Sequence, residues 1–281
     1  MIKLGLIGYP VSHSLSPKIQ NAALKACGLE GDYSLFPIAP DDMPALKDLL
    51  DRVRSGEMTG LNVTIPHKQN VIQFMDELTP TAEAIGAVSV IYLRENKLVG
   101  DNADAPGFLS DLKRFVGDRG MGIPFGHDVG NQNSSLVLGA GGSARAVVYA
   151  LVNDGWKVTL AARRLEQAEQ LARSFPNHEI QITAFTDLRL STFDLLVNTT
   201  PLGMTPNIHI SPLPENIVLP NQLNVYDLVY NPRETTLVRE SRAQGLNATT
   251  GLGMLIEQAA LGFELWTGYK LSSEIFRNAV E

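Results

Sequence analysis

The sequence predicts an α/β protein built from two domains. Its 281 residues exceed the roughly 150 residues typical of one domain. Short apolar runs bounded by Gly, Pro and Asn alternate with segments of helical period, which favours largely parallel sheets. A glycine-rich loop at 139–145 lies between an apolar run and a helical segment. The first expectation is therefore two α/β lobes.

In the N-terminal half, residues 2–7 are predicted as the first strand. Residues 16–27 are predicted as a helix, with Pro at its first position and Gly28 as its stop signal. Residues 61–65 are predicted as a strand that Pro66 ends, and the helix expected after it carries Lys68.

In the second lobe, residues 118–135 are rich in Gly and Asn and are predicted as a loop. The strand 136–138, the glycine loop, the helix 144–152 and the strand 157–161 form a predicted β-α-β unit. Further strands are expected at 195–199 and 224–228, and helices at 254–267 and 272–280.

Composition excludes several functional classes. The net charge is −7 without a basic block, so a nucleic-acid surface is not expected. The single cysteine, Cys27, cannot form an intramolecular disulfide and is compatible with a reducing compartment. No signal peptide or bilayer-spanning run is found, so no membrane contact and a cytoplasmic location are expected. The five histidines lack metal-ligand spacing, and no metal is predicted.

The glycine loop predicts a dinucleotide site. Glycines permit a tight turn and let a pyrophosphate approach the backbone N–H groups at the start of a helix, where the dipole favours anions. The predicted binding residues are Gly139, Ala140, Gly141, Gly142, Ser143 and Ala144. A turn that serves packing alone is the alternative.

Two arginines indicate which dinucleotide is bound. Arg163 and Arg164 follow the second strand of the unit, where an NAD site often has an acidic residue. Guanidinium groups suit a 2′-phosphate, so the sequence favours NADP over NAD. The alternative is a solvated pair of arginines bound to Glu166 or Glu169.

Two serines near the N-terminus could bind a carboxylate or a polyol. Ser14 and Ser16 are two residues apart, so in an extended stretch their hydroxyls point the same way. Ser16 also stands immediately before Pro17, and on local grounds a helix N-cap is its favoured role.

Lys68 and Asp104 are candidates for proton transfer. In the first turn of a helix the dipole would favour the neutral amine of Lys68, whereas a neighbouring Asp104 would stabilise the ammonium, so the operating state stays open. A solvated lysine and a helix cap at Asp104 are the alternatives. Cys27, Met254 and Trp266 are predicted to be buried packing residues.

Together these segments resemble the shikimate dehydrogenase family over nearly the whole chain. The matching segments, in the family's order, are 8–17, 60–68, 86–88, 100–104, 139–145, 198–204, 226–232 and 251–258. Their order and spacing make the resemblance specific.

The resemblance implies an N-terminal substrate domain at 1–105, completed by C-terminal helices at 252–281, and an inserted Rossmann-type NADP domain at 106–251. The active site is expected in the cleft between them. The implied reaction is reversible NADP-dependent reduction of 3-dehydroshikimate to shikimate, on the route to chorismate and the aromatic amino acids. Monomer and homodimer are both open.

The resemblance also assigns residues. Lys68 and Asp104 form the implied catalytic pair. The implied substrate-binding residues are Ser14, Ser16, Asn62, Thr64, Ser89, Asn102, Tyr230 and Gln258. Besides the glycine loop and the two arginines, the implied cofactor contacts are Thr200, Gly203, Met204 and Gly251.

The chain departs from the family pattern at four positions. Ser89 stands where Asn is usual, Ala103 and Ala105 replace Thr and Gly, and Ala162 replaces Asn. Serine cannot make the paired amide contacts of Asn. These departures leave open a quinate or shikimate-like dehydrogenase, and a non-catalytic NADP or sugar-acid sensor is the alternative from another class.

Overall fold

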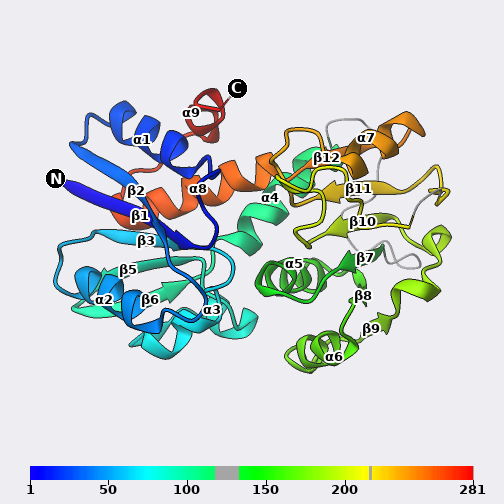
Figure 1. The fold of residues 1–281 in the computed structure, drawn as a ribbon, viewed down its shortest axis with the longest axis horizontal. Coiled ribbons are helices and arrows are strands. Elements are labelled where there is room, and N and C mark those ends of the chain that lie inside the picture. Colours follow the sequence, from blue (N-terminus) through cyan, green and yellow to red (C-terminus); the bar gives the residue numbers. More distant parts are fainter. Residues whose placement is uncertain (118–132, 215–216, 281) are drawn as a thin grey trace. The chain divides into compact units, whose positions relative to one another are not determined.

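The computed structural model describes residues 1–117, 133–214 and 217–280. The chain divides into two compact units, one made of Met1–Gly107 with Ile256–Glu281 and the other of Phe108–Leu255. Each unit contains a six-stranded sheet with helices (Figure 1), so the predicted α/β class is confirmed. Most of the loop expected at 118–135 lies outside the described residues.

The sheet of the first unit is mixed. Its strands lie in the order β2-β1-β3-β5-β6-β4. Strand β1 pairs in parallel with β2 and β3, whereas β5 runs antiparallel to β3 and β6. Glu95 and Asn96 both have positive φ in the β5–β6 hairpin, as a two-residue type I′ turn requires. The strands are β1 (Ile2–Gly8), β2 (Gly31–Pro37), β3 (Gly60–Val63), β4 (Glu77–Leu78), β5 (Val90–Arg94) and β6 (Lys97–Asp101).

Helices pack against this sheet through apolar faces. In α2 (Met43–Arg54), Leu46, Leu49, Leu50 and Val53 recur at helical spacing and are buried in one core with the strands. The other helices are α1 (Ser16–Ala26), η1 (Asn70–Phe74), α3 (Pro80–Ile85), α8 (Leu252–Thr267) and α9 (Ser273–Asn278). Helix α1 ends before Gly28, at φ 63°, as predicted.

The sheet of the second unit is entirely parallel. Its order is β12-β11-β10-β7-β8-β9, which Figure 1 shows as a continuous series. Read from β9, this is the 3-2-1-4-5-6 order of a Rossmann fold, with the reversal between β7 and β10. The strands are β7 (Ser134–Leu138), β8 (Lys157–Ala161), β9 (Ile180–Thr183), β10 (Leu195–Asn198), β11 (Asn224–Asp227) and β12 (Ala248–Thr250). The predicted Rossmann-type domain is confirmed.

Helix α5 (Gly142–Asn153) connects β7 to β8 and buries Val147, Val148 and Leu151. The remaining helices of this unit are α4 (Asp104–Gly117), which begins in the first unit, α6 (Leu165–Arg173), η2 (Phe185–Asp187), η3 (Leu190–Thr192) and α7 (Thr236–Ala243). Strand pairing and helix packing together bring the carboxyl ends of β7, β10 and β11 next to one another.

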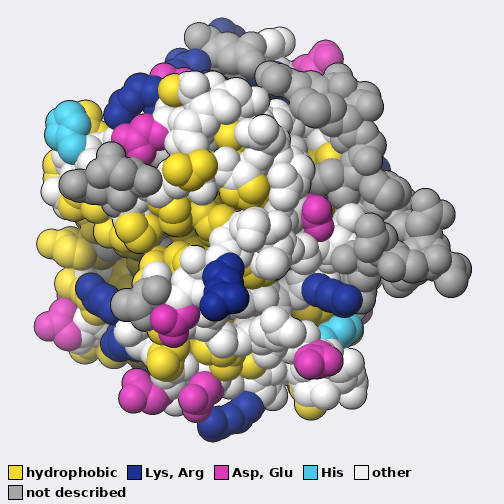
Figure 2. Space-filling view, turned by 90° about the vertical axis from the view of Figure 1, so that its right-hand side faces the viewer, with side chains coloured by type: hydrophobic (Ala, Val, Ile, Leu, Met, Phe, Trp, Pro, Cys, Tyr) yellow, Lys and Arg dark blue, Asp and Glu magenta, His cyan; other side chains and the backbone are white. Residues whose placement is uncertain are grey.

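The surface carries mixed charge. On the face drawn in Figure 2, the described basic and acidic side chains are interspersed and form no continuous basic stripe. Across the described residues, no helix combines the length and apolarity needed to cross a membrane. The prediction that Cys27 is buried is wrong: the residue follows the last turn of α1, at the unit's surface, and is partly exposed.

Candidate functional site

Lys68 and Asp104 are in direct contact in the first unit. The Lys68 ammonium donates to the Asp104 carboxylate, and the two residues are only 9% and 4% exposed. The Val88 N–H binds the Lys68 carbonyl at 2.8 Å and fixes its backbone. Burial of an opposite-charge pair holds both groups in one geometry.

The predicted helix around Lys68 is wrong. Strand β3 ends at Val63, and Lys68 lies in a turn before the short η1. The His67 N–H donates to the Thr64 carbonyl, an i to i+3 bond that closes a turn rather than an α-helix. The helix-dipole argument for a neutral amine therefore has no structural basis here.

The helix cap predicted as an alternative for Asp104 is also absent. The Asn102 Oδ1 accepts the N–H groups of Asp104 and Ala105, at 3.0 and 3.2 Å, at the start of α4. This arrangement leaves the Asp104 carboxylate free to bind Lys68.

Ser14 and Ser16 place their hydroxyls together, 3.1 Å apart. The segment is not extended as expected, because Leu15 has helical φ and ψ and is the N-cap position of α1. Ser16 is therefore the first residue of the helix, and its predicted capping role is wrong. Its N–H instead donates to the Ser14 Oγ at 3.2 Å. Ser14 thus binds an N–H group of the first helical turn that has no partner within the helix.

Buried polar side chains near Lys68 are held by internal hydrogen bonds. The Asn62 Nδ2 donates to the Ser89 carbonyl at 3.2 Å, and its Oδ1 accepts the Tyr33 hydroxyl at 2.8 Å. The Ser89 Oγ accepts the Ala103 N–H at 2.9 Å. Tyr33 was not identified from the sequence; the structure shows it as the buried residue of strand β2.

The other predicted substrate residues are divided between the units. Thr64 follows β3, and its methyl group packs so closely on Gly8 that a Cβ added to Gly8 would collide with it. The Asn102 Nδ2 donates to the Ala87 carbonyl at 2.9 Å, and Gln258 packs its backbone and Cβ on Gly107. All three belong to the first unit, whereas Tyr230 belongs to the second.

The glycine loop in the second unit joins β7 to α5. Gly139 has a φ of 109° that favours glycine, and a Cβ there would lie 2.7 Å from the Thr199 Oγ1. Gly141 is the N-cap residue of α5, without a capping side chain, and a Cβ there would meet nothing within 4 Å. The predicted loop thus leaves the N-terminus of α5 accessible. Ala140, Gly142, Ser143 and Ala144 complete the segment.

Arg163 and Arg164 lie two and three residues beyond the end of β8 and are exposed. Glu169, their suggested partner, instead binds Arg173 at 2.8 Å. Within the described ranges, neither Arg163 nor Arg164 forms an ion pair, so their guanidinium groups remain available for a ligand. Arg145 donates to the Ser174 Oγ at 3.0 Å.

The remaining predicted cofactor residues follow β10 and β12. Thr200 binds the Asn198 Oδ1 through its N–H and its hydroxyl, at 3.0 and 2.7 Å. Gly203 has a φ of 90° and precedes Met204. A Cβ on Gly251 would lie 2.2 Å from the Leu228 carbonyl oxygen, so only glycine allows this close backbone contact.

Asp227 is a buried carboxyl group at the carboxyl end of β11. Burial raises its pKa to about 6, although hydrogen bonds from Thr235, Val229 and Asn198 oppose that rise. Asp227 lies in the family-like segment 226–232, but the sequence pattern alone assigns this residue no role.

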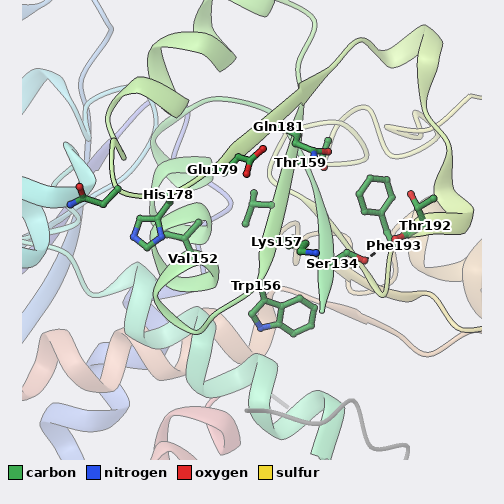
Figure 3. Close-up of a pocket in the computed structure, with 12 residues that line it drawn as sticks. Ser134, Val152, Trp156, Lys157, Thr159, His178, Glu179, Gln181, Thr192 and Phe193 are labelled. Atoms are coloured by element: carbon green, nitrogen blue, oxygen red, sulfur yellow. Dashed lines mark hydrogen bonds between the residues drawn. The ribbon is translucent and has the colours of Figure 1, made fainter. Parts of the chain in front are cut away.

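A separate pocket of about 460 Å³ lies in the second unit. Ser134, Lys157 and Phe193 line it at the amino ends of the strands, with His178 and Glu179 nearby (Figure 3). Ligands of parallel α/β sheets bind at the carboxyl ends, where the glycine loop lies, so this pocket is not the candidate dinucleotide site. Among the described residues, no group of three or more His, Cys, Asp or Glu could hold a metal.

Sequence comparisons identify the family. Residues 6–91 match the family described as "Shikimate dehydrogenase substrate binding domain", 127–210 match "Shikimate / quinate 5-dehydrogenase", and 251–281 match "Shikimate 5'-dehydrogenase C-terminal domain". The shikimate dehydrogenase (NADP(+)) of Bacillus subtilis (strain 168) is 37% identical over 98% of this chain and 95% of its own. The chain belongs to the shikimate dehydrogenase family.

Other family members are comparably similar. The shikimate dehydrogenase (NADP(+)) of Salinibacter ruber is 41% identical over 93% of this chain and 90% of its own. A crystal structure of a shikimate dehydrogenase in complex with NADP+ has a TM-score of 0.88 and 35% identity, covering 99% of this chain and 94% of that one.

The shikimate 5-dehydrogenase of Thermus thermophilus, in complex with NADP(H) and shikimate, has a TM-score of 0.84 and 37% identity, covering 99% of this chain and 98% of that one. The ligand-free 5-ketofructose reductase of a Gluconobacter strain has a TM-score of 0.82 and 28% identity, covering 99% and 97%. The likeness to shikimate dehydrogenases therefore extends over the full fold.

Proposed function

We propose that this shikimate dehydrogenase family member catalyses the reversible NADP-dependent reduction of 3-dehydroshikimate to shikimate. The observation that carries the proposal is the buried contact between Lys68 and Asp104. Both residues belong to the first unit, and residues 6–91 of that unit match the family's substrate-binding domain. The reaction is a step toward chorismate and the aromatic amino acids, and we place it in the cytoplasm.

The residues of the second unit fit NADP. The N-terminus of α5 offers backbone N–H groups without a capping side chain, and space lies over Gly141. Arg163 and Arg164 are exposed beyond β8 and can bind a 2′-phosphate. When bound, NADP(H) accepts or donates the hydride. Thr200, Gly203, Met204 and Gly251 are the proposed contacts at the nicotinamide side.

The residues of the first unit fit a sugar acid. The paired hydroxyls of Ser14 and Ser16 are proposed to bind the carboxylate, together with Thr64. Asn62, Ser89, Asn102 and Gln258 are proposed to bind the ring hydroxyls. Tyr230, from the second unit, is the remaining proposed substrate contact.

Lys68 is proposed to move the proton. As a ketone is reduced, negative charge develops on its oxygen, and a positioned N–H donor at that atom lowers the barrier. Lys68 donates the proton in reduction and removes it in oxidation. Asp104 holds the amine in place through the contact already described.

The test is a turnover measurement with shikimate and quinate, each with NADP and NAD. We expect kcat/KM to be highest for shikimate with NADP. Higher kcat/KM on quinate would replace the substrate assignment, whereas bound NADP without turnover of either acid would favour a sensor.

A further inference from the structure

Asp227 is a buried, multiply hydrogen-bonded carboxylate of the second unit that the proposed mechanism does not use. It is fully buried at the end of β11. Its Oδ1 accepts the Asn198 Nδ2 at 2.8 Å and the Val229 N–H at 3.0 Å, and its Oδ2 accepts the Thr235 hydroxyl at 2.6 Å. Such a site orients its donors because an unpaired buried polar group is costly.

Asn198 is the residue that Asp227 orients. Both hydrogens of its amide group have acceptors, Asp227 at 2.8 Å and the Leu202 carbonyl at 3.4 Å. Its Oδ1 accepts both the N–H and the hydroxyl of Thr200. Rotating this amide by half a turn would direct its oxygen at the Asp227 carboxylate, so the carboxylate fixes which end faces Thr200.

The segment that Asn198 holds is 199–204. Thr199 donates its N–H and hydroxyl to the Leu138 carbonyl, at 3.0 and 2.6 Å, and Gly139 lies directly against it. Thr200 accepts the Leu202 N–H at 3.3 Å. The segment thus borders the glycine loop at the reversal point of the strand order, where dinucleotides bind in this fold.

We propose that Asp227 is a positioning residue for the cofactor segment 199–204 and acts through the Asn198 amide. The inference rests on the proposed function, because it assigns that segment to NADP binding. Asp227 itself need not touch the cofactor. Loss of its carboxylate would leave the Asn198 amide free to rotate and the segment free to move.

The test is a double-mutant cycle read out by NADP+ binding. Asp227→Ala and Asn198→Ala should each raise the Kd for NADP+ about tenfold, the effect of losing one charge-assisted hydrogen bond. The double variant should resemble either single variant, because both disrupt the same unit. Asp227→Asn, which keeps one acceptor oxygen, should restore part of the affinity. The Kd for shikimate, measured without NADP+, should not change.

A matched control is Asp194→Asn. Asp194 also accepts a backbone N–H and a hydroxyl, both from Ser134, but at the amino ends of the strands. This variant should bind NADP+ like the wild type. Additive effects of Asp227→Ala and Asn198→Ala, or an unchanged Kd in both, would overturn the inference. Absence of NADP+ binding in the wild type would instead refute the proposed function.

Discussion

The Lys68 amine and the Asp104 carboxylate bind each other across 36 positions of sequence, inside the first unit. A turn after β3 carries the amine, and the first residue of α4 carries the carboxylate. Two backbone anchors keep them in place, the Val88 N–H on the Lys68 carbonyl and the Asn102 side chain on the Asp104 N–H. Hydrogen bonds within the protein therefore position the pair.

Replacing Lys68 by Met should lower kcat at least about a hundredfold, because positioned proton transfer contributes about 10²–10⁴ in rate. Methionine keeps much of the apolar volume and removes the proton. Steady-state oxidation of shikimate with NADP gives the value, and far-UV circular dichroism checks the fold.

The control for Lys68 is Lys47→Met. Lys47 binds Asp51 at 2.6 Å on the exposed face of α2, where such pairs contribute about 1 kcal/mol or less to stability. Its kcat should match the wild type. A Lys68→Met protein that retained more than about a tenth of wild-type kcat would exclude Lys68 as the proton donor.

Arg163→Ala should weaken NADP binding about tenfold or more and leave NAD binding nearly unchanged. A charge-assisted hydrogen bond to phosphate contributes about 1.5–3 kcal/mol, and only NADP carries the 2′-phosphate. The ratio of kcat/KM for the two cofactors measures the effect. Arg173→Ala is the control, since Arg173 is an exposed arginine bound to Glu169 on α6. An unchanged ratio in Arg163→Ala would show that other residues bind the 2′-phosphate of NADP.

Much of the fold could be predicted because its signals are local. The strand at Lys157–Ala161 has the predicted bounds, and the glycine loop lies between a strand and a helix as expected. The pairing order of the strands carries no local signal, and the antiparallel β5 of the first unit was not anticipated.

The sequence indicated which residues form the candidate site better than it indicated their local backbone geometry. Lys68 lies in a turn because the Thr64 carbonyl takes the His67 N–H, a choice that apolar periodicity does not encode. The capping predictions also failed: at the start of α1 the side chain that binds a backbone N–H is that of Ser14 and not Ser16, and at the start of α4 it is that of Asn102 and not Asp104. Neighbouring Asx and Ser side chains compete for the same N–H groups, and tertiary contacts decide between them.

Gly141→Ala and Gly139→Ala should separate cofactor binding from folding. Gly141 has a φ of −86°, and an added Cβ would meet nothing in the chain. The free energy of unfolding should therefore stay constant or rise by about 0.4–1 kcal/mol, while the methyl group obstructs the pyrophosphate and weakens NADP binding. Gly139→Ala should destabilise the protein, because its φ is 109° and the Cβ would collide with Thr199. Normal NADP binding by Gly141→Ala would show that this loop does not bind the cofactor.

Asp227 should make stability fall as pH rises from about 4 to 7. Burial raises its pKa from 3.8 to about 6, so between these values the folded protein binds a proton that the unfolded chain lacks. The carboxyl is therefore favourable when protonated, and above about pH 6 its ionisation costs about 3 kcal/mol of unfolding free energy. Urea unfolding at several pH values should show that cost in the wild type relative to Asp227→Asn.

The Thr235→Val variant is a second test of the Asp227 titration. The Thr235 hydroxyl donates to the Asp227 Oδ2 at 2.6 Å and lowers the pKa of that carboxyl. Without this donor the pKa should rise further, so the loss of stability should extend to higher pH than in the wild type. A stability difference between wild type and Asp227→Asn that stays flat with pH would show that Asp227 titrates alike in the folded and unfolded states. In that case its hydrogen bonds compensate its burial fully.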